Sequence, residues 1–211
     1  MMDVGTQLVQ AYLHVCGYFT ATEYPLVESL GDQAPRTLTD IDMLAVRLAR
    51  PVGNAARRAR VSVTGPVVVE PDPALACPAD GTDMIVAEIK QGRAQVNPGA
   101  RNHKVLAAAL TRFGCCAAAE APGLVQTLLS RGRAQGETGH VIRMVLFASR
   151  GERAPGGWHW VHLDHVFRYL EDYLQQEQRV LGGVDLRDPA LGWLSLLRKC
   201  ELTLNAHGSA S

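Results

Sequence analysis

Apolar residues recur along the chain with two spacings, and each spacing predicts one kind of element. Recurrence every three to four residues predicts helices over residues 6–15, 101–119, 120–130, 162–177 and 189–202. Pro122-Gly123 predicts a break near the start of the third of these. Short runs of apolar, aromatic and β-branched residues predict strands over residues 18–28, 38–48, 84–90 and 141–148. This order of helix, three strands, helix, strand and helix predicts a mixed α/β fold with helices on the faces of the sheet.

The remaining segments read as turns and loops. Residues 61–69 are typical of a short hairpin around Gly65-Pro66, and residues 132–139 and 151–157 are predicted as loops. The 211 residues suffice for one domain with a substantial core. No apolar run is long enough to span a bilayer, and the first residues lack the basic region and apolar core of a secretion signal. Five cysteines without a paired framework favour a reduced setting, so we expect a cytoplasmic protein without a membrane partner.

The predicted strand 84–90 ends in two opposite charges, Glu88 and Lys90. Side chains alternate between the faces of a strand, so the charges share one face with Met84 and Val86, opposite Ile85, Ala87 and Ile89. Burying either charge is costly unless something compensates it. A metal ion held by Glu88, with Lys90 facing the same substrate, would supply that compensation. The alternative is a salt-bridged strand end at the surface, which contributes little.

A second acidic position lies in the preceding predicted strand, where Asp40 and Asp42 interrupt an apolar run. An aspartate inside a strand is unfavourable, unless a neighbouring strand brings another ligand to the same metal. Asp42 followed by Glu88-Ile89-Lys90 resembles the PD-(D/E)xK nuclease superfamily, which includes restriction endonucleases and Holliday-junction resolvases. The resemblance implies a restriction endonuclease-like αβββαβ core over residues 1–150, with a mixed sheet flanked by helices. Residues 151–211 would then be a C-terminal helical extension packed on the same domain.

The chain departs from this family in its first helix. Many members have a glutamate there, whereas this chain has Thr6, Gln7 and Gln10 at comparable positions. Glu23 or Glu28 on the first predicted strand are candidate substitutes. Asp40 shares a strand face with Asp42 and is an alternative ligand, although the apolar residues that follow Asp42 fit the family better.

These residues predict a particular chemistry. Mg²⁺ prefers oxygen ligands and is usually held by one or two carboxylates together with several waters. Asp42, Glu88 and the main-chain carbonyl of Ile89 would hold Mg²⁺ or Mn²⁺, and Lys90 would position the nucleophile or stabilise developing charge. We therefore expect a metal-dependent hydrolase, an endonuclease or exonuclease that cuts DNA phosphodiester bonds. The alternatives are a catalytically inactive nuclease-fold subunit acting in nucleic-acid binding or assembly, and an α/β protein with no nucleic-acid role.

The distribution of charge bears on the partner. The net charge is zero, yet residues 43–69 and 89–119 contain no acid and several arginines and lysines. This segregation indicates either a local basic surface or unrelated solvated side chains. DNA is the expected partner, and a homodimer or a multi-subunit defence or repair assembly is compatible with the family.

Four further groups of residues have two readings each. The helix start at Arg101, His103 and Lys104 is either a phosphate contact or a solvated helix end. Gln91 either positions a water or ends the strand. His162 and His165 share a helix face and are either metal ligands or surface residues. Trp158 and Trp160 are predicted as packing anchors, with DNA stacking as the alternative.

Overall fold

The computed structural model describes residues 3–28, 36–49, 71–137, 139–151, 154–177 and 186–202, with the backbone alone at 24–28, 36–40 and 155. The predicted hairpin at 61–69 lies outside these ranges. No helix in the described ranges is long and apolar enough to cross a membrane.

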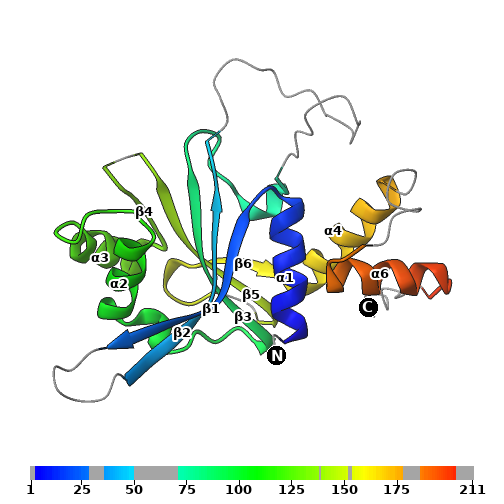
Figure 1. Ribbon diagram of the computed structural model, residues 1–211, viewed down its shortest axis with the longest axis horizontal. Helices are drawn as coiled ribbons and strands as arrows, with labels where there is room; N and C mark the ends of the chain where they lie inside the picture. Colours follow the sequence, from blue (N-terminus) through cyan, green and yellow to red (C-terminus); the bar gives the residue numbers. More distant parts are fainter. Residues whose placement is uncertain are drawn as a thin grey trace.

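Six strands form one mixed sheet in the order β1-β2-β3-β5-β4, and β6 also pairs with β5 (Figure 1). The strands are β1 (Phe19–Glu28), β2 (Arg36–Arg47), β3 (Asp83–Arg93), β4 (Arg133–Gln135), β5 (Val141–Arg150) and β6 (His159–His162). The pairs β1–β2, β2–β3 and β4–β5 are antiparallel, whereas β3–β5 and β5–β6 are parallel. The chain crosses from β3 to the parallel β5 through two helices, as a parallel connection requires.

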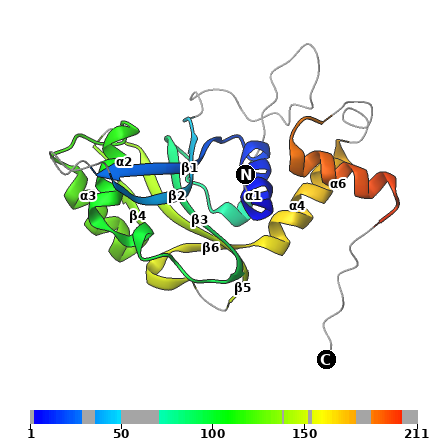
Figure 2. The same cartoon turned by 60° about the horizontal axis from the view of Figure 1, so that its bottom comes forward.

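The described residues include five α-helices, which lie on the two faces of this sheet (Figures 1 and 2). One face is covered by α1 (Val4–Val15), α4 (Leu163–Gln176) and α6 (Pro189–Lys199), and the other by α2 (His103–Arg112) and α3 (Ala121–Arg131). Side-chain caps define several helix starts, because Asp3, Asn102 and Asp188 each accept a hydrogen bond from a first-turn N–H. The predicted mixed α/β fold with helices on both faces is confirmed.

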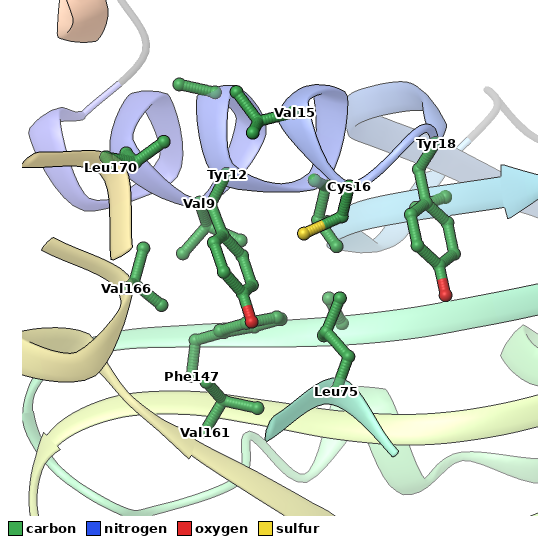
Figure 3. Packing of buried hydrophobic residues seen from close by; sticks show 14 of the residues in the cluster. Val9, Tyr12, Val15, Cys16, Tyr18, Leu75, Phe147, Val161, Val166 and Leu170 are labelled. Atoms are coloured by element: carbon green, nitrogen blue, oxygen red, sulfur yellow. The ribbon is translucent and has the colours of Figure 1, made fainter. Parts of the chain in front are cut away.

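The core consists of two apolar layers, one on each side of the sheet. Alternation along β3 divides its side chains as predicted, with Ile85, Ala87 and Ile89 toward α1 and Met84 and Val86 toward α2. On the α1 side, the ring of Tyr12 packs edge-on against two other aromatic rings, those of Phe147 and Tyr169. Figure 3 shows Val9, Tyr12, Val15, Cys16 and Tyr18 beside Leu75, Phe147, Val161, Val166 and Leu170.

Four details of the sequence prediction are corrected by the structure. The predicted loop 132–139 contains strand β4, and β6 occupies 159–162, where no strand was predicted. The helix predicted over 101–119 ends at Arg112, and Gly114 follows with a φ of +70°. Pro122 does not break α3, because proline lies in the first turn, where its missing N–H has no intrahelical partner to lose. The predicted helical extension thus also contributes a strand, β6, to the sheet.

Candidate active site

Strands β2 and β3 separate at the level of the predicted site. They pair from Arg47 opposite Asp83 up to Met43 opposite Ala87, where the ladder ends. At the next residue a side chain takes the place of a main-chain acceptor: Oδ2 of Asp42 accepts a hydrogen bond from the Ile89 N–H at 2.8 Å. Beyond this point β3 continues along β5, while the β1–β2 hairpin extends in a different direction (Figure 1).

The backbone is irregular on both strands of the hairpin at this level. Ile41 and Leu44 both belong to the layer toward α2, so the alternation of β2 is broken between them. Glu23 and Asp42 lie between the paired positions Thr22–Met43 and Tyr24–Ile41 of the β1–β2 register, and Glu23 has a φ of +50°. Such a conformation is unusual for a residue other than glycine and costs roughly 1–3 kcal/mol. Backbone strain of this kind often occurs at functional sites, so this part of the sheet is a candidate for one.

Glu88 is a buried carboxylate, and only 1% of the residue is exposed. Its Oε1 accepts hydrogen bonds from the Lys90 ammonium at 2.6 Å and from the Asn97 N–H at 3.1 Å. Burial raises the pKa of Glu88 and the nearby charge of Asp42 raises it further, whereas Lys90 and Asn97 lower it; the net shift is upward. A buried carboxylate is costly to keep ionised, so a cation beside it would stabilise the site.

Lys90 lies beside both carboxylates. Its Nζ is 2.6 Å from Oε1 of Glu88 and 3.7 Å from Oδ2 of Asp42, and its side chain is 24% exposed. The structure therefore brings together the three side chains that the sequence singled out. The alternative reading, a salt-bridged strand end at the surface, is seen in part: Glu88 and Lys90 form an ion pair of 2.6 Å, but the Glu88 side chain is almost fully buried.

The donor set suits a hard divalent cation. The second oxygens, Oδ1 of Asp42 and Oε2 of Glu88, accept no hydrogen bond from the described part of the chain. Among the described residues no group of three or more His, Cys, Asp or Glu side chains could hold a metal. A centre here would consist of two carboxylates and the main-chain carbonyl of Ile89, with water completing the shell, which is how proteins commonly bind Mg²⁺.

Of the three alternative acidic ligands, the structure describes the side chain of Glu23 alone. Asp40 and Glu28 lie on β2 and β1, but their side chains are outside the described part of the structure. Glu23 is exposed beside Asp42. On the first helix, Thr6 bonds to the capping Asp3, and Gln10 donates to Thr20.

The other candidate residues have structural partners. Gln91 donates to Asp3 at 2.8 Å and so ties the end of β3 to the start of α1, which supports its reading as a polar strand end. His162 and His165 pair with different carboxylates, Asp164 and Asp72.

The tryptophans and the helix start complete the set of candidates. Trp158 is buried in the layer toward α2, as expected of a packing anchor, and Trp160 is partly buried against the same layer. Arg101, His103 and Lys104 are exposed around the start of α2, so they stay candidates for a phosphate contact.

Sequence reasoning missed one contributor to the site, the Asn97 N–H that binds Glu88. The run Asn97-Pro98-Gly99 signals only a turn, because a main-chain donor leaves no mark in residue type. A scan against protein-family models, a search of curated proteins and a search of solved structures each found no match.

Proposed function

We propose that the protein is a nuclease that hydrolyses DNA phosphodiester bonds with Mg²⁺ or Mn²⁺, built on a PD-(D/E)xK-type core. The observation that carries the proposal is the convergence of Asp42, Glu88 and Lys90 where two central strands part. Asp42 comes from β2 and the other two from β3, and the two carboxylates lie 3.7 Å (Asp42) and 2.6 Å (Glu88) from the Lys90 ammonium.

The topology supports the same proposal. Helix α1 is followed by the antiparallel strands β1, β2 and β3, then by α2, α3 and the short strand β4, and then by β5 parallel to β3. This succession agrees with the αβββαβ order implied by the resemblance, with one additional helix and one short additional strand in the crossover. The acid on β2 and the Glu-x-Lys on β3 occupy the strands that this order assigns to them.

Each side chain has a defined role in this proposal. Asp42 and Glu88 would hold the cation, and the Ile89 N–H orients the Asp42 carboxylate. The bound metal supplies Lewis acidity: it lowers the pKa of a coordinated water and offsets charge on the phosphate. Lys90, partly exposed beside both carboxylates, is placed to orient the attacking water or to stabilise the charge that develops on the phosphate.

Two arginines favour a polyanionic substrate. Arg93 and Arg150 lie opposite each other at the ends of the parallel strands β3 and β5, and both are exposed. No ion pair joins either of them to another described residue. Like charges on paired strand positions are unfavourable, and phosphate groups of a nucleic acid would relieve that repulsion. Arg93 lies three residues beyond Lys90 along β3.

The test begins with metal binding. Mn²⁺ is titrated by calorimetry into the wild type and into Asp42→Ala/Glu88→Ala, and binding that is lost in the double variant supports the site. Mg²⁺-dependent cleavage of duplex and single-stranded DNA is then measured for Glu88→Ala and Lys90→Ala. Asp164→Ala, which removes an exposed carboxylate on α4, is the matched control.

The outcomes separate the candidate functions. Cleavage that is lost in both site variants and kept in the control supports the nuclease, and cleavage kept in both site variants refutes it. Salt-sensitive DNA binding without cleavage by the wild type points to an inactive nuclease-fold subunit. No DNA retention at low salt refutes both.

A further inference from the structure

The buried carboxylate of Glu88 depends on a segment that the end of β5 holds in place. The Asn97 N–H that binds Glu88 belongs to the chain that leaves β3. Three residues earlier, the Ala94 N–H donates to the carbonyl of Arg150 at 2.7 Å. The Ser149 hydroxyl donates to the carbonyl of Gln91 at 2.6 Å. Two hydrogen bonds with β5, one accepted by the Arg150 carbonyl and one donated by Ser149, therefore fix the start of the segment that carries Asn97.

The far end of the same segment is fixed by a turn. The Ala100 N–H donates to the Asn97 carbonyl at 3.1 Å, and a short 3₁₀ helix, Gly99–Arg101, follows. Asn102 then caps α2 through a bond from the Lys104 N–H at 2.9 Å. Residues 94–97 are thus held between β5 and α2, and the position of the Asn97 N–H follows from both anchors.

Gly151 leaves no room for a side chain beside this segment. A Cβ built on Gly151 would lie 2.7 Å from the Ala94 Cβ and 3.6 Å from its nitrogen. Gly151 also has a φ of +148°, which favours glycine. Any side chain at this position would push Ala94 away from β5. Gly92, on the adjacent part of β3, has nothing within 4 Å of the same hypothetical atom, so it provides a matched control.

We propose that residues 149–151 at the end of β5 are positioning residues for the metal ligand Glu88. By holding residues 94–97 against β5, they place the Asn97 N–H on Oε1, beside the Lys90 ammonium. With two donors on one oxygen the carboxylate cannot rotate freely, and Oε2 is the oxygen left for the cation. Glu88 would then bind the cation through that oxygen. The part that concerns the metal rests on the proposed function, whereas the orientation of Glu88 does not.

The test compares Gly151→Ala with Gly92→Ala and uses two readouts. Hydrogen exchange of the Asn97 amide, followed by NMR without metal, reports the bond to Glu88. Mn²⁺ affinity, measured by calorimetry, reports the ligand geometry. We expect faster Asn97 exchange and an affinity lower by about 10–100-fold in Gly151→Ala, the range for loss of a group that orients a metal ligand. Both quantities should match the wild type in Gly92→Ala.

Ser149→Ala is the second variant and removes only one hydroxyl, so it decides the matter if Gly151→Ala does not fold. In Ser149→Ala we expect Asn97 exchange to be faster and Mn²⁺ affinity to be lower than in the wild type, by less than in Gly151→Ala. Unchanged Asn97 exchange and unchanged Mn²⁺ affinity in the folded variants would overturn the proposal. If Asn97 exchange responds as expected while the wild type binds no Mn²⁺, the positioning of Glu88 is supported and the nuclease proposal fails.

Discussion

The ion pair between Asp83 and Arg143 is expected to be the most sensitive electrostatic contact in the described fold. Asp83 begins β3 and is fully buried, and Arg143 on β5 is 4% exposed. The guanidinium binds the carboxylate through two bonds, of 2.9 and 2.7 Å, and donates a third to the Leu75 carbonyl at 2.6 Å. The Tyr18 hydroxyl donates to the same carboxylate. The perturbation is Asp83→Asn, which keeps the shape and removes the charge.

The magnitude follows from this burial. Burial lowers the pKa of Arg143, and its bonds to Asp83 raise it. When the carboxylate is lost the guanidinium stays charged, because arginine is effectively always protonated in proteins. Removing one partner of a buried pair leaves an uncompensated charge and typically costs about 3–5 kcal/mol. For a chain of this size each kcal/mol corresponds to roughly 2–4 °C, so the Tm should fall by about 6–20 °C.

The assay is urea unfolding followed by circular dichroism, with Tm as a second measure. The comparator is Arg168→Ala, which breaks an exposed i,i+4 pair with Asp164 on α4 and should change the free energy of unfolding by less than about 0.5 kcal/mol. A double variant, Asp83→Leu/Arg143→Met, removes both charges. It should regain most of the loss, because an apolar pair of similar volume needs no compensation.

A loss below about 1 kcal/mol in Asp83→Asn, no greater than the usual effect of a point mutation, would mean that Arg143 reaches water or another acceptor when Asp83 is neutral. A double variant less stable than Asp83→Asn would also refute the prediction, because the charge would then not be the cause of the loss.

Three further predictions concern the candidate site. Lys90→Met removes the ammonium bonded to Glu88, so Mn²⁺ affinity measured by calorimetry should hold or rise while DNA cleavage falls by about 10²–10³-fold; a parallel loss of metal affinity would contradict this role. Burial raises the pKa of Glu88 above its unfolded value, so its ionised form destabilises the fold above that pKa and protonation relieves the cost at lower pH. Glu88→Gln should therefore raise the Tm at pH 7, and the gain should shrink as the pH falls through the pKa of Glu88; a gain independent of pH would count against an ionised Glu88 as its source. Replacing Arg93 and Arg150 by alanine should reduce the slope of log affinity for DNA against log salt by about one per arginine, and an unchanged slope, like that expected for Arg168→Ala, would exclude them as phosphate contacts.

The local patterns of the chain were enough to predict much of the architecture. The two-residue alternation of Met84 to Lys90 identified which side chains share a face of β3, because side-chain direction in a strand depends only on position along it. The apolar stripes of α1 and α4 were predicted for a similar reason, since helical spacing is also local. Asp42 is recognisable from the sequence as a candidate site residue, because a charge inside an apolar run is locally unusual.

Other features required the folded chain. Strand β4 has three residues with only Ala134 buried, so its own pattern carries almost no signal. Strand β6 is four residues long and exists through its pairing with β5. The partner of Gln91 is Asp3, at the other end of α1 from the start of β1, and no local pattern connects two residues so far apart.

The sequence by itself determined the faces of the central strand, most of the helices and the three residue types at the candidate site. Only the tertiary structure decided that Asp42 meets Glu88 and Lys90, that Glu88 is buried, and that the Asn97 N–H and the end of β5 hold it. The reason is physical: periodicity is written in neighbouring residues, whereas burial, strand separation and main-chain hydrogen bonds depend on segments that become neighbours only when the chain folds.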